Sequence, residues 1–139
     1  MMEDKATNPR NCSAGVCSPE RTQGLITSVP KGDHLLVSLK GPGLFIAAEV
    51  VKQGGSSDLT FVIMDIDGRN VTDISYVAAR NSGLTVQNPY GIVYLPADRL
   101  DNLAIGFPTP LRFEKELKLS VKVNEEGVVQ ILANVIHGR

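Results

Sequence analysis

The sequence predicts an all-β fold: an antiparallel sandwich of two sheets, jelly-roll-like, preceded by an extended N-terminal arm. Three observations predict it. From Gln23 onward, short apolar runs alternate with turn residues at a spacing typical of sandwiches and barrels. No segment of ten or more residues keeps the 3.6-residue period of an amphipathic helix. The connections between the runs are too short for helical crossovers, which favours antiparallel pairing.

The first 23 residues differ from the rest and are predicted to form the arm. They are mostly polar and lack apolar periodicity, whereas residues 24–139 form the predicted β-sandwich domain. Charges in the arm balance, because Lys5, Arg10 and Arg21 stand against Glu3, Asp4 and Glu20. Nucleic-acid binding relies on an excess of Lys and Arg, so this balance predicts no direct contact with nucleic acid.

The first half of the predicted sandwich consists of short strands separated by turns. We expect strands over residues 25–29, 35–40, 44–51 and 59–66, with turns or loops at residues 30–33, 41–43 and 53–58. Asp67-Gly68 is a two-residue hairpin signal, because both central positions of a type I′ turn need positive φ. Residues 71–77 are then expected to return beside residues 59–66.

The middle of the chain gives weaker signals. Residues 78–83 are ambiguous and could hold one short helical turn. Short strands are expected at residues 84–86 and 91–95, on either side of Asn88-Pro89.

The C-terminal third alternates most clearly. A strand is expected over residues 100–107 and is predicted to end at Pro108-Thr109-Pro110. In residues 111–123 apolar side chains keep one parity and polar side chains the other, which predicts a long strand with one buried face. We expect this strand to bend near Glu114-Lys115, and residues 128–136 to form the closing strand.

Two cysteines, Cys12 and Cys17, lie in the predicted arm. Four residues separate them, with no second cysteine pair and no nearby histidine, which makes a structural zinc site a poor interpretation. An intrachain disulfide, an inter-subunit disulfide and two free thiols remain. The start of the chain has no apolar core typical of a secretory signal, so we expect synthesis in a cytoplasm, which favours free thiols.

The hairpin region also resembles the start of a calcium-binding loop. Asp65, Asp67, Asn70 and Asp73 could supply oxygen ligands to Ca²⁺. The segment lacks the glutamate at the twelfth position and the flanking helices of an EF-hand. A hairpin turn explains the same residues, so we predict neither a metal nor any other cofactor.

The sequence also predicts that the protein is not an enzyme. The only histidines are His34 and His137, and no nucleophile-elbow motif surrounds any serine. The net charge is −1, and no apolar run is long enough to span a bilayer, so we expect no membrane insertion. Glycan or receptor binding on the sandwich stays open, with candidate aromatic contacts at Tyr76, Tyr90, Tyr94 and Phe107.

Two segments of the chain resemble jelly-roll structural domains of phage and virus particle proteins. The segment Asp65-Ile66-Asp67-Gly68-Arg69-Asn70-Val71 looks like a hairpin common in viral sandwich domains, and residues 111–121 are similar to a strand found late in such domains. The resemblance implies a capsid, decoration, fibre or tail subunit that forms symmetric homo-oligomers.

The same resemblance implies where the protein acts and what it contacts. It places the protein in the virion after synthesis in the host cytoplasm, with residues 1–23 contacting other assembly proteins. The alternatives are a carbohydrate- or receptor-binding module and a subunit of a bacterial or archaeal filament at the cell surface.

Overall fold

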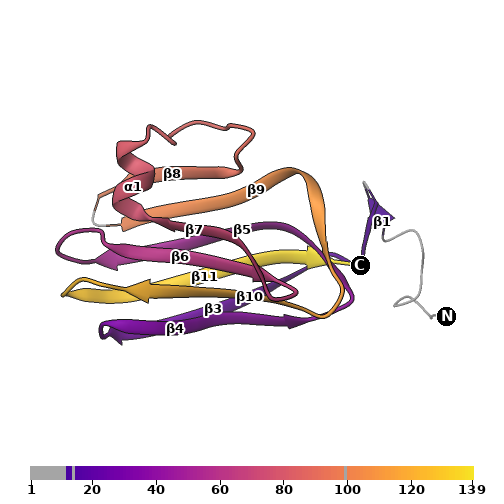
Figure 1. Cartoon of the computed structure of the whole chain (residues 1–139), viewed down its shortest axis with the longest axis horizontal. Coiled ribbons are helices and arrows are strands. Elements are labelled where there is room, and N and C mark those ends of the chain that lie inside the picture. The colour runs from indigo at the N-terminus through magenta and orange to yellow at the C-terminus, as the bar shows by residue number, and fades with distance from the viewer. Residues whose placement is uncertain (1–11, 14, 99) are drawn as a thin grey trace.

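The computed structural model describes residues 12–13, 15–98 and 100–139. Two antiparallel sheets pack face to face, as Figure 1 shows, and most of the described chain is strand. The predicted all-β two-sheet sandwich is therefore confirmed. Within the described residues, no helix combines the length and the apolar character needed to cross a membrane.

The larger sheet has five strands and contains both the first long strand and the last one. Across the sheet they follow the order β3 (Glu20–Val29), β11 (Val128–Gly138), β5 (Gly43–Gly54), β9 (Leu100–Phe113) and β8 (Ile92–Ala97).

The smaller sheet has four strands. Their order is β4 (Gly32–Lys40), β10 (Glu116–Val123), β6 (Thr60–Ile66) and β7 (Arg69–Ser75).

The order of the strands is that of a jelly roll. The chain alternates between the sheets through β3, β4, β5 and β6, and alternates again through β9, β10 and β11 on its return. As a result, β11 lies between β3 and β5, and β10 lies between β4 and β6. This double wrapping is the arrangement that defines jelly-roll sandwiches.

The core lies between the sheets and follows the two-residue period of the sequence. In β10 the inward side chains of Leu117, Leu119 and Val121 are fully buried. In β11 the inward partners Ile131 and Ala133 are also fully buried. Most of the hydrophobic stabilisation comes from this interior, because burial of apolar area is the main favourable contribution to folding.

The predicted single strand over residues 111–123 is wrong. β9 ends at Phe113 and β10 begins at Glu116, and the two strands belong to different sheets. The expected bend is a change of sheet, where the backbone N–H groups of Glu114, Lys115 and Glu116 donate to the Asp67 carboxylate at 2.9, 2.8 and 3.0 Å. The apolar parity continues because both strands face the same interior.

The prolines at 108 and 110 do not end β9, contrary to the prediction. Ala47 pairs with Gly106 and Phe45 with Leu111, so residues 107–110 of β9 bulge opposite the single residue Ile46. A bulge tolerates proline because its residues need not donate to the neighbouring strand.

A short helix, α1 (Tyr76–Asn81), follows β7. It overlaps the ambiguous residues 78–83 and includes residues 76 and 77, which were wrongly expected to continue the strand. The Ser75 side chain caps it by accepting a hydrogen bond from the backbone N–H of Ala78 at 3.1 Å. The strand expected at residues 84–86 is not formed, and these residues belong to the loop between α1 and β8. The predicted hairpin at Asp67-Gly68 is present, and both residues have positive φ, 51° and 80°.

The predicted arm is partly built into the sandwich. The strands β1 (Cys12–Ser13) and β2 (Val16–Cys17) form a hairpin, and Cys17 exchanges two backbone hydrogen bonds with Arg139 at 2.6 and 2.8 Å. β3 starts at Glu20, which pairs with His137, so the predicted boundary at residue 23 lies inside a strand. Residues 1–11 lie outside the described part of the chain.

Candidate functional site

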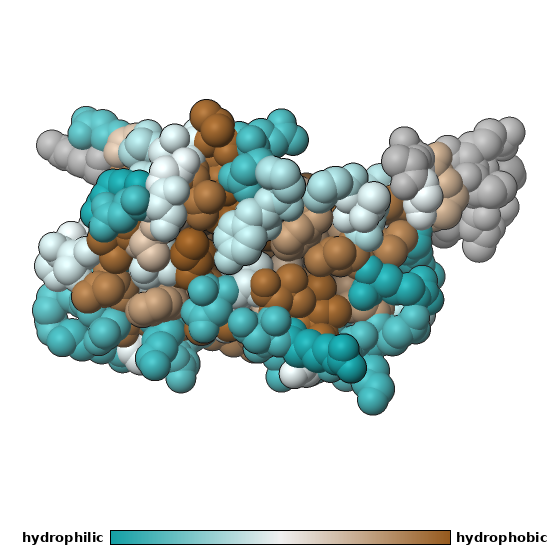
Figure 2. Space-filling model, turned by 45° about the horizontal axis from the view of Figure 1, so that its top comes forward, coloured by the Kyte–Doolittle hydropathy of each residue, from teal (hydrophilic) through white to brown (hydrophobic). Residues whose placement is uncertain are grey.

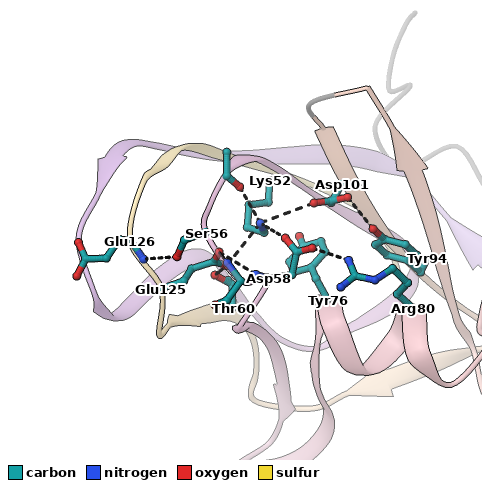
Figure 3. A network of polar contacts seen from close by, with 12 residues as sticks. Lys52, Ser56, Asp58, Thr60, Tyr76, Arg80, Tyr94, Asp101, Glu125 and Glu126 are labelled. Atoms are coloured by element: carbon teal, nitrogen blue, oxygen red, sulfur yellow. Dashed lines mark hydrogen bonds and ion pairs between the residues drawn. The ribbon is translucent and has the colours of Figure 1, made fainter.

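Charged residues, two of them fully buried, gather at the end of the sandwich where the β5–β6 loop, the β10–β11 turn and α1 meet (Figure 3). We call this group the charge cluster: Lys52 on β5, Asp58 in the β5–β6 loop, Arg80 on α1, Asp101 on β9 and Glu125 in the β10–β11 turn. Buried titratable groups with shifted pKa values often mark functional sites, so the cluster is the first candidate.

Lys52 is fully buried at the centre of the cluster. Strand alternation points it inward, since Val50 on the same face of β5 is also fully buried. Its Nζ donates to the Gly54 carbonyl and to Asp58 Oδ1, both at 2.8 Å. The same atom lies 5.3 Å from the ring centroid of Tyr76, within the range of a cation–π contact.

Two further carboxylates surround the Lys52 ammonium. Glu125 Oε2 lies 3.5 Å and Asp101 Oδ2 3.7 Å from Nζ. A buried lysine is tolerated only when it is paired in this way, because removing an unpaired charge from water costs several kcal/mol.

Glu125 joins two loops. Its side chain is fully buried, and its Oε1 accepts the backbone N–H groups of Ser57 and Asp58 at 3.1 and 2.9 Å. Its Oε2 accepts the hydroxyl of Thr60 at 2.5 Å. Gly55 passes so close that a Cβ there would overlap the Glu125 carboxylate, which explains a glycine at this position.

Asp58 connects the lysine to the helix. Its Oδ2 accepts a hydrogen bond from Arg80 Nη1 at 2.5 Å. Burial opposes the ionisation of Asp58, but the hydrogen bonds from Lys52 and Arg80 outweigh it and lower the pKa of Asp58. Asp58 therefore stays a carboxylate at neutral pH.

Two tyrosines border the cluster as neutral groups. The Tyr76 hydroxyl donates to the Val50 carbonyl at 2.6 Å, and the Tyr94 hydroxyl donates to Asp101 Oδ1 at 2.7 Å. Burial, reinforced by the nearby carboxylates, raises the pKa of Tyr76 well above its usual value. Burial and the hydrogen bond to Asp101 also raise the pKa of Tyr94.

The chemistry of the cluster is that of a structural network. Two positive and three negative side chains give it a net charge of −1. Lys52 Nζ is buried and already contacts the Gly54 carbonyl and three carboxylates, so it is poorly placed to act as a nucleophile on a substrate. Glu125 already accepts three hydrogen bonds and is poorly placed to exchange protons with a substrate.

The four calcium candidates do not form a shared site. The Asp67 carboxylate accepts the three backbone N–H groups at the β9–β10 corner, and these bonds lower the pKa of Asp67. Asp65 accepts the Asn70 side-chain amide at 3.0 Å, while Asp73 is exposed on β7. Among the described residues, no group of three or more acidic, histidine or cysteine side chains could hold a metal ion.

Cys12 and Cys17 form an intrachain disulfide, which corrects the preference for free thiols. The two residues are directly opposite in the β1–β2 hairpin, so strand pairing brings their side chains together. This hairpin could not be predicted from the sequence, because residues 12–17 contain no alternating run.

The histidines and most of the aromatic candidates have structural partners. His34 Nε2 lies 2.8 Å from the Pro30 carbonyl, and His137 Nε2 lies 2.8 Å from the Thr22 hydroxyl. Among the aromatics, Tyr76 and Tyr94 are buried and Phe107 packs edge-on against the Phe45 ring at 6.2 Å. Of the four aromatic candidates, only Tyr90 is largely exposed, at 57%.

The outer face of the five-stranded sheet carries a second group of polar residues that the sequence did not reveal. Arg21 donates to Asn134 at 2.8 Å, and the amides of Asn134 and Asn102 donate to the two oxygens of Glu49 at 3.1 and 3.0 Å. A shallow depression of about 430 Å³ lies beside them, lined by Arg21, Ala47, Ala48, Glu49, Asn134 and Ile136. The four hydrogen-bonded residues come from four different strands, so only the register brings them together.

Comparison with known proteins adds no family to this description. No protein-family model matches the chain, and no curated protein matches its sequence significantly. The fold is thus a jelly-roll-like sandwich. At one end of it, which we call the loop end, the charge cluster joins the β5–β6 loop, the β10–β11 turn and α1.

Proposed function

We propose that this protein is a non-enzymatic structural subunit that assembles into a symmetric homo-multimer, and that the multimer belongs to a virus particle. The observation that carries the proposal is the jelly-roll order of the strands, an architecture that recurs in capsid proteins. A fold alone does not fix a function, so the remaining support must come from the surface and from rigidity.

Rigidity supports the proposal. The charge cluster ties the β5–β6 loop, the β10–β11 turn and α1 to one another at one end of the sandwich. At the other end, Asp67 holds the β9–β10 corner. A subunit with both ends fixed presents the same surface to every neighbour, which regular assembly requires.

The sheet edges are protected, so assembly is expected to use faces or loops. At one edge, β3 approaches β4 so closely that a Cβ on Gly24 would overlap the Leu36 carbonyl. At the other edge, α1 packs against β7 and β8 (Figure 1). Such coverage limits the uncontrolled strand pairing that open edges permit.

Apolar side chains also reach the surface. The space-filling view in Figure 2 shows them among polar groups on the face that it presents. Scattered exposed apolar side chains are normal, whereas groups of them indicate interaction sites. The most exposed large apolar residues include Leu25, Leu35, Val86, Tyr90, Leu95 and Val129.

Sedimentation velocity of the full chain, combined with negative-stain electron microscopy, tests the proposal. We expect a discrete multimer whose population grows over about a hundredfold range of protein concentration, as mass action requires. Rings, shells or filaments of uniform size would support a particle component. A monomer throughout that range, with no rings, shells or filaments in the images, would contradict the proposal.

One loop favours a second candidate function, the binding of a receptor or glycan. In the loop between α1 and β8, the Asn88 side chain donates to the carbonyls of Val86 and Ile92 at 2.9 and 2.8 Å and accepts the Gly91 N–H at 3.1 Å. The loop is thereby fixed, with Val86 and Tyr90 exposed at 69% and 57%. Rigid exposed tyrosines are typical anchors of binding surfaces.

A glycan array and a cell-binding assay test this second candidate. Binding by the wild type that Tyr90→Ala abolishes, and that Tyr94→Phe leaves intact, would support it. No detectable binding by the wild type in either assay would contradict this second function.

A further inference from the structure

A row of apolar side chains crosses the outer face of the five-stranded sheet. The pairing of the five strands aligns one outward-facing residue from each strand across the sheet, and Asn102 is the only polar residue among the five. At the two ends of the row, Leu25 is 53% and Leu95 is 45% exposed. We call this the apolar row: Leu25, Leu132, Val51, Asn102 and Leu95.

The polar groups on one side of the apolar row bind one another within the sheet, while the buried Oδ1 of Asn102 in the row itself has no partner among the described residues. Glu49 has both oxygens bound by asparagine amides, and Asn134 in turn accepts from Arg21. Among the residues of this face that the register places around the row, Arg21 and Glu49 carry the only charges, and these cancel. Covering the face would therefore bury little uncompensated charge.

The outer face of the four-stranded sheet has a different character. There β10 directs Glu116, Lys118 and Lys122 outward, and Lys118 pairs in register with Asp65 of β6. The cores of protein interfaces are depleted in charged residues. Of the two faces, the five-stranded one therefore suits a docking surface.

The size of the face fits a protein partner. Five strands spaced about 4.8 Å apart span roughly 24 Å, and four rows of side chains along the strands span roughly 27 Å. The product is about 650 Å² per copy, or about 1,300 Å² for two copies, which lies within the range of specific interfaces.

The composition of residues 1–11 makes them a poor match for an apolar surface. Residues 1–11 contain only three apolar side chains, Met1, Met2 and Ala6, among polar and charged ones. Nucleic acid and anionic lipid both need several cations, and this face offers Arg21 alone. A second copy brings a face of the same size, equally apolar and without net charge.

We propose that the outer face of the five-stranded sheet packs against the same face of a second copy, with the apolar row at the centre of the interface. Aligned sheet-on-sheet packing about 10 Å apart is a standard way to bury two such faces. The inference rests on the proposed assembly function and specifies the contact through which assembly begins.

Sedimentation equilibrium of the full chain with one arginine introduced on each face tests the interface. Leu25→Arg places a charge in the apolar row at an exposed position, where a longer side chain can extend into solvent. Leu35→Arg is the matched control, because Leu35 is similarly exposed, at 57%, on β4 of the other sheet. We expect Leu25→Arg to weaken self-association at least about tenfold, a loss near 1.4 kcal/mol, and Leu35→Arg to leave it unchanged.

The possible outcomes separate this interface from the function on which it rests. A wild-type multimer that Leu25→Arg and Leu95→Arg both leave intact would overturn the interface while the assembly function stands. A wild-type monomer would overturn the assembly function and the interface together. Circular dichroism and thermal melting of each variant show whether the fold is retained. If an arginine variant does not fold, Val51→Thr, a milder change in the same row, replaces it in the self-association experiment.

Discussion

At the scale of single residues, the side chains that define the loop end are the ones that local sequence patterns describe least well. Lys52 shares its parity with the buried residues Ala48 and Val50, so alternation alone pointed it into the core. Its partners Asp58, Asp101 and Glu125 come from three other segments. Since no spacing rule connects these segments, the sequence could not reveal the charge cluster, although a lysine at an inward position was an available signal.

Removal of the Lys52 charge is expected to destabilise the fold strongly. Lys52→Met keeps most of the volume but leaves Glu125 buried without its cation, a change that typically costs about 3–5 kcal/mol. Urea unfolding checks the free energy of unfolding. Lys118→Met, on the solvent face of β10, is the control and should change it by less than about 0.5 kcal/mol. Equal stability of Lys52→Met and wild type would contradict a structural role for the cluster.

The pH dependence of stability follows from Asp58. Its pKa is lower in the folded state, so the unfolded state binds more protons in acid. The stability that this group contributes is complete above the unfolded pKa, about 3.9, and is lost as pH falls through the lower folded pKa. Urea unfolding between neutral and acidic pH should show this loss.

Asp58→Asn provides the comparison for the pH experiment. The variant should be less stable than wild type at neutral pH, and the difference should shrink below about pH 4 as the wild-type carboxyl becomes protonated. A difference that stays constant down to the lowest pH would mean that the ionised form of Asp58 contributes nothing.

At the scale of secondary-structure elements, apolar runs bounded by turn residues predicted β6 and β11, and alternation predicted the half-buried character of β10 but not where it begins. Periodicity failed where a local bond or a bulge decided the structure. The same apolar parity runs through Phe113 and Leu117, so alternation could not show that the chain changes sheets between them. Likewise, the two prolines of β9 predicted the end of the strand, although they lie in a bulge within it.

The β9–β10 corner is expected to depend on Asp67. Asp67→Ala removes the acceptor of three backbone N–H groups and also places alanine at a positive φ. Asp67→Asn tolerates that φ and keeps one acceptor oxygen, so its melting temperature should lie between those of Asp67→Ala and wild type. Thermal unfolding checks this order, with Asp73→Asn on the exposed side of β7 as the control. An Asp67→Ala melting temperature equal to that of the control would refute this role for the corner.

At the scale of the whole molecule, composition and periodicity predicted the fold class, but the polar faces depended on register. The strand order brings β3, β11, β5 and β9 together, so that residues far apart in the chain, such as Arg21, Glu49 and Asn134, form one surface. One molecule thus combines a rigid loop end, protected edges and one low-charge face.

Native mass spectrometry of the full-length protein tests the proposed assembly most directly. The subunit has a mass of 15.0 kDa. We expect a discrete species at a whole-number multiple of that mass, which Leu25→Arg converts to smaller species while Leu35→Arg does not. A single species at 15.0 kDa at every concentration tested would contradict the assembly of this protein into a multimer.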